Sequence, residues 1–83
     1  MKIEYTASVM VPAGWRSITV TALVNRVSKA MAEVIEVVAI DGEAPTGWTS
    51  RTGAKRQTFN ARGIAQREIG MRKRLSACSI IED

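Results

Sequence analysis

The chain has 83 residues, of which 46% are apolar and 24% charged, an ordinary globular composition that predicts one folded domain over residues 1–83. It contains no histidine and one cysteine, which excludes histidine-dependent catalytic triads, an internal disulfide, and zinc sites made of several cysteines or histidines. The net charge is +4, but residues 1–50 carry four basic and five acidic side chains, whereas residues 51–83 carry eight basic and three acidic ones.

The apolar segments are short. No apolar run exceeds the four residues from Val37 to Ile40, which is too short to span a membrane. The first residues, Met1 to Glu4, lack the cationic stretch and apolar block of a secretory signal. We therefore expect a cytoplasmic protein without a membrane partner.

Residues 2–24 have the pattern of an antiparallel β-hairpin. Apolar and polar side chains alternate over residues 2–11, which is typical of a strand with one buried face. Residues 12–14 are Pro-Ala-Gly, which favour a turn, and the alternation then resumes. Two alternating runs joined by a short turn predict a hairpin. On its inner face we expect Ile3, Tyr5, Ala7, Val9 and Val11, followed by Ile18, Val20, Ala22 and Val24.

Residues 28–41 fit two structures. Apolar residues recur at three- and four-residue steps, as in an amphipathic helix, and Ser28 would be a suitable N-cap. Against a helix, residues 34–40 are rich in β-branched side chains and end at an Asp41-Gly42 turn. We favour a third strand over roughly 30–41, after a turn at 26–29. A helix over 28–38 is the alternative.

The second half begins with an irregular region. Glycines and a proline punctuate residues 42–54, and residues 55–59 have the composition of a short extra strand. Asn60 is a suitable N-cap for a helix that ends near Ile69, because Gly70 stands where a C′ glycine belongs. After Gly70 the alternation returns and predicts a C-terminal strand. Cys78 and Ile80 break this alternation, which fits either a bulge or burial on both faces. A single helix over 61–78 is the alternative.

These elements predict an α+β fold. Its small antiparallel sheet would consist of a β-meander of about three strands, followed by a short helix and a C-terminal strand. The helix would pack on one face of the sheet, because this is the simplest arrangement that buries the apolar stripes.

Few residues have the pattern of a catalytic site. The carboxylate pairs Glu33/Glu36 and Asp41/Glu43 are sequence neighbours, which are typical of surfaces and turns. The segment from Gly47 to Lys55 lacks the spacing of a phosphate-binding loop. Cys78 is surrounded by apolar residues and is interpreted as a small core residue. We therefore predict a protein that is not an enzyme and holds neither a cofactor nor a metal.

The basic residues of the second half favour an anionic partner. Between Arg51 and Arg74, eight cations are accompanied by one acidic residue, Glu68. We expect the phosphate backbone of a nucleic acid to be bound here. Trp48 and Phe59 are available for stacking on unpaired bases, or alternatively for pinning this segment to the core. The predicted contacts are Arg51, Lys55, Arg56, Arg62, Arg67, Arg72 and Arg74.

A second hypothesis is a protein-interaction module or an inhibitor that covers the acidic surface of a partner protein. Small sheets have open edges that pair with a partner strand or with a second copy, so a homodimer is included. Trp15 next to Arg16 is the kind of aromatic–arginine pair found at the centre of interfaces.

Overall fold

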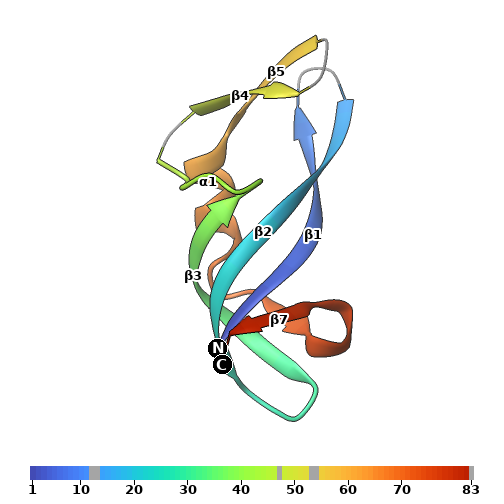
Figure 1. Ribbon diagram of the computed structural model, residues 1–83, viewed down its shortest axis with the longest axis vertical. Coiled ribbons are helices and arrows are strands. Elements are labelled where there is room, and N and C mark those ends of the chain that lie inside the picture. Colours follow the sequence, from blue (N-terminus) through green and yellow to red (C-terminus); the bar gives the residue numbers. More distant parts are fainter. Residues whose placement is uncertain (12–13, 47, 53–54, 83) are drawn as a thin grey trace.

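The computed structural model describes residues 1–11, 14–46, 48–52 and 55–82, and for residues 11, 48–52 and 55–59 it describes the backbone alone. This part of the chain contains seven strands, one α-helix and one 3-10 turn (Figure 1). In chain order the elements are β1 (Lys2–Val11), β2 (Gly14–Arg26), β3 (Met31–Ile40), β4 (Trp48–Thr52), β5 (Lys55–Asn60), α1 (Ala61–Glu68), β6 (Arg72–Arg74), η1 (Leu75–Ala77) and β7 (Ser79–Glu82).

The strands form two antiparallel sheets. The larger sheet has the order β6-β3-β2-β1-β7, and the smaller one consists of β4 and β5. The predicted meander is confirmed, because β1 pairs with β2 from Lys2↔Leu23 to Val11↔Gly14 and β2 pairs with β3. The α+β class with an antiparallel sheet is therefore correct, although the described chain is mostly sheet.

Residues 31–40 form a strand, so the helical alternative for residues 28–38 is wrong. The register of β3 against β2 shifts twice, once between Val34 and Glu36 and once between Val37 and Ala39. Each shift leaves one extra residue on β3, Ile35 and Val38, which are both exposed. Two β-bulges thus change the spacing of the buried residues from two to three, which resembles helical periodicity. The buried residues of β3 are Ala32, Val34, Val37 and Ile40.

The larger sheet is strongly curled. Its edge strands β6 and β7 are joined only by residues 75–78, which include the 3-10 turn η1. In a flat sheet of five strands the edges would lie about 19 Å apart, because neighbouring strands are about 4.8 Å apart. A 3-10 turn rises only about 2 Å per residue, so the link is too short for a flat sheet. The curl brings the edges together, and the bulges of β3 add to the twist.

The core lies on the concave face of this curled sheet. Predicted inner residues of β1 and β2 are buried, except that Ala7 and Val9 are only partly covered and residue 11 lies outside the described side chains. Two alanines of α1 join the same cluster. The buried residues are Ile3, Tyr5, Ile18, Val20, Ala22, Val24, Ala32, Val34, Val37, Ile40, Ala61 and Ala65.

The helix α1 begins and ends where the sequence predicts. The Asn60 side chain accepts a hydrogen bond from Gly63 N at 2.9 Å, and Gly70 takes a left-handed φ of 89° just beyond the helix. The alternative of one helix over 61–78 is therefore wrong. In Figure 1, α1 lies beside β3, while its packing over one face of the sheet stays a prediction. Within the described residues, no helix has the length and apolarity of a membrane span.

Two further predictions need correction. The irregular region predicted for residues 42–54 contains β4, which pairs with the correctly predicted strand at 55–59. The predicted C-terminal strand is divided by η1 into β6, which pairs with β3, and β7, which pairs with β1. A single strand could not reach both edges of the sheet, whereas two short strands with a turn between them close the curled sheet.

Candidate nucleic-acid interface

Part of the predicted interface belongs to the smaller sheet. Its strands β4 and β5 carry five predicted contact or stacking residues, whose side chains lie outside the described residues. The backbone places them on two neighbouring antiparallel strands. These residues are Trp48, Arg51, Lys55, Arg56 and Phe59.

The two arginines of α1 do not share one side of the helix. Arg62 and Arg67 are both exposed. Five positions separate them, which corresponds to about 140° around the helix axis. Each therefore extends over a different part of the surface, and they do not form one continuous patch by themselves.

The three cations of β6 are divided by the alternation of the strand. Lys73 points inward, with its Nζ 3.3 Å from Glu68 Oε1 and 4.4 Å from the centre of the Tyr5 ring. Arg72 and Arg74 are exposed, and Arg72 Nε lies 3.7 Å from Glu33 Oε1. An exposed ion pair of this length contributes little and leaves Arg72 accessible. Lys73, in contrast, is already engaged by a carboxylate.

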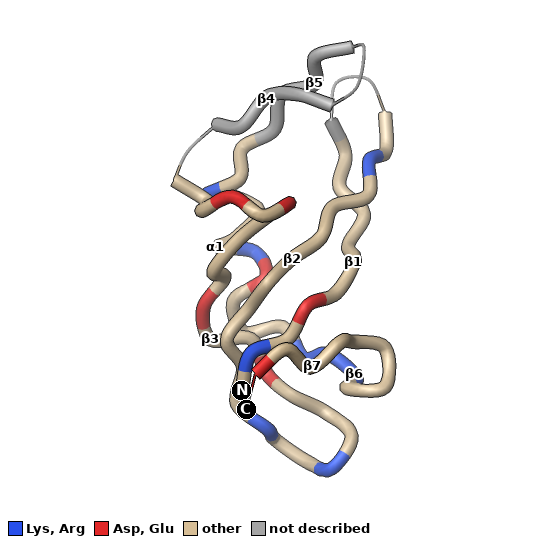
Figure 2. Tube along the Cα trace, viewed as in Figure 1, with Lys and Arg blue, Asp and Glu red and all other residues tan. Residues whose placement is uncertain are grey.

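The pairing of β6 with β3 places Arg74 at the same end of the larger sheet as two cations from the other half of the chain. Arg74 is the register partner of Met31, and Leu75 N donates a hydrogen bond to Ala30 O at 2.8 Å. Arg26 is the last residue of β2 and Lys29 lies on the loop that follows, at the end of the molecule where Figure 2 shows basic residues on the turn into β3. We name Arg26, Lys29 and Arg74 the basic end. All three are exposed, and none forms an ion pair with a carboxylate of the described residues.

The loop that carries the basic end is held by local hydrogen bonds. Ser28 Oγ accepts from Ala30 N at 3.3 Å and from Met31 N at 3.2 Å. Arg26 Nη1 donates to Lys29 O at 3.1 Å across the loop. Side-chain acceptors of this kind fix a turn without a regular helix or sheet ladder. The backbone of Lys29 is therefore positioned before any ligand binds.

The sequence missed Arg26 and Lys29 as members of the interface. They belong to the half of the chain with a net negative charge, so charge counting along the sequence does not single them out. The available signal was the predicted turn at 26–29, which begins and ends with a cation.

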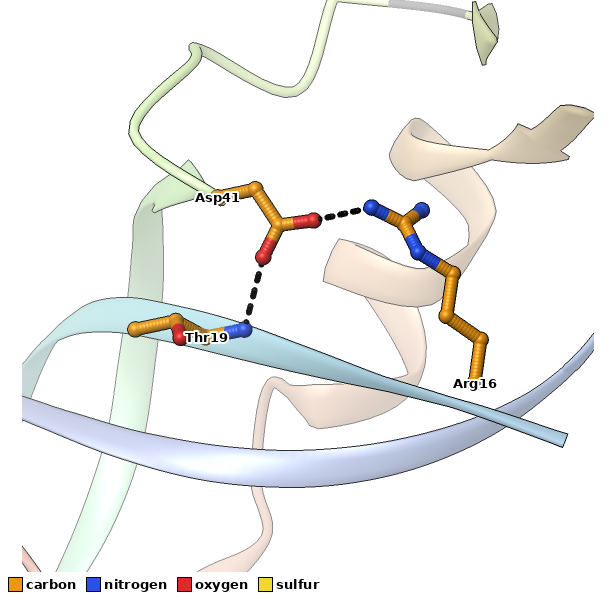
Figure 3. A network of polar contacts seen from close by, with 3 residues as sticks. All are labelled: Arg16, Thr19 and Asp41. Atoms are coloured by element: carbon orange, nitrogen blue, oxygen red, sulfur yellow. Dashed lines mark hydrogen bonds and ion pairs between the residues drawn. The ribbon is translucent and has the colours of Figure 1, made fainter. Parts of the chain in front are cut away.

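At the other end of β2, Arg16 is turned toward a carboxylate. Its Nη2 lies 2.6 Å from Asp41 Oδ2, while Asp41 Oδ1 accepts a hydrogen bond from Thr19 N at 2.9 Å (Figure 3). Trp15 is 71% exposed and stands opposite Met10, which is 62% exposed. Because neighbours in a strand point to opposite faces, Trp15 and Arg16 do not form one anchor.

An internal cluster of titratable groups links α1 to the sheet. The Tyr5 hydroxyl donates a hydrogen bond of 2.5 Å to Glu68 Oε1, the same oxygen that Lys73 approaches. Burial raises the pKa of Tyr5 far above its usual value, and the bond to Glu68 raises it further. Burial also raises the pKa of the Cys78 thiol, although Lys73 acts in the opposite direction. Both groups are therefore harder to ionise than in water, which is typical of structural residues and opposite to an activated thiolate.

The chain matches no protein-family model, and no curated protein or solved structure is significantly similar to it. Its function must therefore be inferred from its own charges, contacts and exposed surfaces.

Proposed function

We propose that this protein binds the phosphate backbone of nucleic acids and that the basic end is the centre of the contact. The observation that supports this is the position of Arg26, Lys29 and Arg74 at one end of the larger sheet, where all three are exposed and no described carboxylate lies in ion-pair distance. Arg26 and Arg74 lie on opposite faces of the sheet, because their partners Ala32 and Met31 are neighbours in β3. Unpaired cations that gather on a small basic protein attract polyanions.

The predicted residues of the second half extend this contact. Arg72 lies two residues from Arg74 on β6 and points to the same exposed face, since alternate residues of a strand share a face. Arg62 and Arg67 add positive charge on α1, and Arg51, Lys55 and Arg56 are further proposed contacts on β4 and β5. Contacts between such side chains and phosphates carry no sequence information, so binding is weakly sequence-specific.

Salt dependence is the primary test. Each neutralised phosphate contributes about 0.9 to the slope of log affinity against log salt on duplex DNA, so three contacts give a slope of about −2.7. With the three contacts of the basic end alone, affinity for a labelled duplex falls roughly 40-fold when the salt concentration is raised fourfold, and each further contact steepens this fall. Fluorescence anisotropy with labelled DNA and RNA measures this slope. Absence of binding to both polymers at low salt would contradict the proposal.

Two charge-matched variants locate the contact. Lys29→Gln with Arg74→Gln removes two cations from the basic end and is expected to reduce the slope by about 2. Arg62→Gln with Arg67→Gln removes the same charge from α1 and serves as the control, with a smaller expected effect because these two side chains lie apart. An equal loss in both double variants would show that net charge alone, and not the basic end, determines affinity.

A further inference from the structure

One edge of β1 lacks a partner over half of its length. The strand pairs with β2 from Lys2 to Val11, but it pairs with β7 only at residues 2–4. Beyond Glu4, none of the described strands pairs with this edge of β1. The strand β5 approaches β1, but its described pairing is with β4. We name residues 6–10 of β1 the open edge.

The backbone groups of the open edge can be identified from the register. Val24 N donates to Met1 O at 2.9 Å, which continues the pairing Lys2↔Leu23 by one residue. Hydrogen-bonded and non-hydrogen-bonded pairs alternate in an antiparallel ladder, so the odd-numbered residues of β1 bond to β2. The even-numbered residues Thr6, Ser8 and Met10 then direct their N–H and C=O groups away from β2, into the open edge.

Thr19 supports the same assignment. It is the partner of Thr6, so its backbone groups face away from β1. Asp41 binds both of them, because Asp41 N donates to Thr19 O at 2.8 Å and Asp41 Oδ1 accepts from Thr19 N. Asp41 thus satisfies the outward backbone groups of Thr19 on β2, whereas no described strand pairs with the outward groups of Thr6 on β1.

The open edge carries neither a charged side chain nor a proline that would discourage pairing. Natural edge strands are shielded by charged side chains or proline, but residues 5–10 are Tyr-Thr-Ala-Ser-Val-Met. Thr6 and Ser8 are exposed and neutral. Their partners on β2 are neutral too: Ser17, opposite Ser8, is exposed, and Thr19, opposite Thr6, is partly covered. Each copy of this protein carries a net charge of +4. Residues 6–10 contain no charged side chain, so pairing two copies along this segment brings no like charges together there.

The apolar side chains around the open edge are incompletely covered. Met10 and Trp15 stand opposite each other on the outer face and are the most exposed large apolar residues of the described chain. On the inner face, Ala7 and Val9 contact the core but are only partly buried. A strand added beside β1 would cover parts of both faces, which β1 and β2 cannot cover by themselves.

We propose that a second copy of this chain supplies this strand, by antiparallel pairing of the two β1 strands about a two-fold axis at Ser8. In this register Ser8 faces Ser8 of the other copy, and Thr6 faces Met10. The three outward residues of each copy then exchange about six backbone hydrogen bonds. A two-fold axis uses the same surface twice, which the neutral, self-matching sequence of the open edge allows. The product is one continuous antiparallel sheet across two copies.

The oligomeric state tests this proposal. Sedimentation equilibrium after nuclease treatment, at a salt concentration that abolishes nucleic-acid binding, is expected to give about twice the mass of 9.1 kDa. A mass of one copy at every concentration would overturn the proposal. Because nucleic acid is absent, this result is independent of the proposed phosphate binding.

Ser8 and Ser17 provide a matched pair of variants. They are direct partners, both are exposed, and both lie on the outer face, but only Ser8 belongs to the open edge. Ser8→Lys places like charges opposite each other across the axis and is expected to weaken dimerisation roughly fivefold or more. Ser17→Lys adds the same charge and leaves the dimer intact. Equal weakening by both variants would overturn the assignment of the interface.

Amide exchange gives a second readout at single residues. In concentrated protein, the amides of Thr6, Ser8 and Met10 are expected to become slower to exchange than in dilute protein. The amides of Ala7 and Val9 are already bonded to β2 and change little. A dimer whose formation leaves the three even-numbered amides unchanged would use another surface and would contradict the proposal.

Discussion

Asp41 is bound to Thr19 through both its backbone and its side chain. The Asp41 amide donates to Thr19 O at 2.8 Å, and the Asp41 carboxylate accepts from Thr19 N at 2.9 Å. To make both contacts, Asp41 adopts a φ of 51°, in the left-handed region. Its second carboxylate oxygen binds Arg16. This residue therefore ends the pairing of β3 with β2 and begins the turn at Gly42.

Substitutions of Asp41 separate these contributions. Asp41→Asn keeps an acceptor for Thr19 N and tolerates the left-handed region, so it loses mainly the ion pair with Arg16, at a cost of about 1 kcal/mol or less. Asp41→Ala loses the acceptor and adds backbone strain, at a cost of roughly 1–3 kcal/mol. Urea unfolding monitored by tryptophan fluorescence measures both. An alanine variant as stable as the asparagine variant would contradict a role for the bond to Thr19.

Tyr5→Phe removes the hydroxyl that bonds Glu68. The carboxylate keeps Lys73 but loses a donor in a mostly buried site, so we expect the free energy of unfolding to fall by about 1–3 kcal/mol. Glu68→Gln is the companion variant. Since the two residues interact directly, the double variant should be less destabilised than the sum of the single variants, and strict additivity would show that they are not coupled.

The protein has one tyrosine, so its titration can be followed by phenolate absorbance. The pKa of Tyr5 is raised in the folded state by burial and by Glu68, whereas in the unfolded chain it is about 10. The unfolded state therefore loses this proton first as pH rises, and stability falls above pH about 10. We expect phenolate absorbance to appear together with unfolding. Ionisation near pH 10 with the fold intact would disprove the buried hydrogen bond.

Gly70→Ala tests the end of α1. Gly70 has a φ of 89°, and a Cβ added there would meet nothing within 4 Å. The cost is therefore conformational and is expected to be about 1–2 kcal/mol, since left-handed backbone disfavours alanine. Gly70→Asn, which tolerates this region better, should cost less. Thermal unfolding measures both variants, and an alanine variant of unchanged stability would contradict the left-handed conformation.

The parts of the fold that the sequence predicts are those in which one local rule applies without interruption. The hairpin of β1 and β2 alternates over its whole length, and α1 has both its Asn60 cap and Gly70. The third strand was ambiguous because bulges at Ile35 and Val38 change its period. The division of the C-terminal segment into β6, η1 and β7 depends on the curl of the sheet, and no local sequence pattern predicts that curl.

The candidate interface was only partly predictable, for a related reason. Charge counting along the chain selects Arg74 but groups it with Lys73, which the alternation of β6 turns toward Glu68. Arg26 and Lys29 join Arg74 only because β6 pairs with β3. Long-range pairing of this kind places side chains from distant segments together, and a single sequence does not reveal it.

The pairing of β1 with both β2 and β7 determines the order in which this protein can fold during synthesis. The contact with β2 closes a short loop and can form as soon as residue 26 has left the ribosome. The contact Lys2↔Glu82 joins residues that are 80 positions apart, so it carries a large loop-closure entropy cost and can form only after residue 82 has been synthesised. Until then, β1 of the nascent chain is unpaired along the whole of the side that later meets β7, so this edge is exposed longer than any other part of the first hairpin.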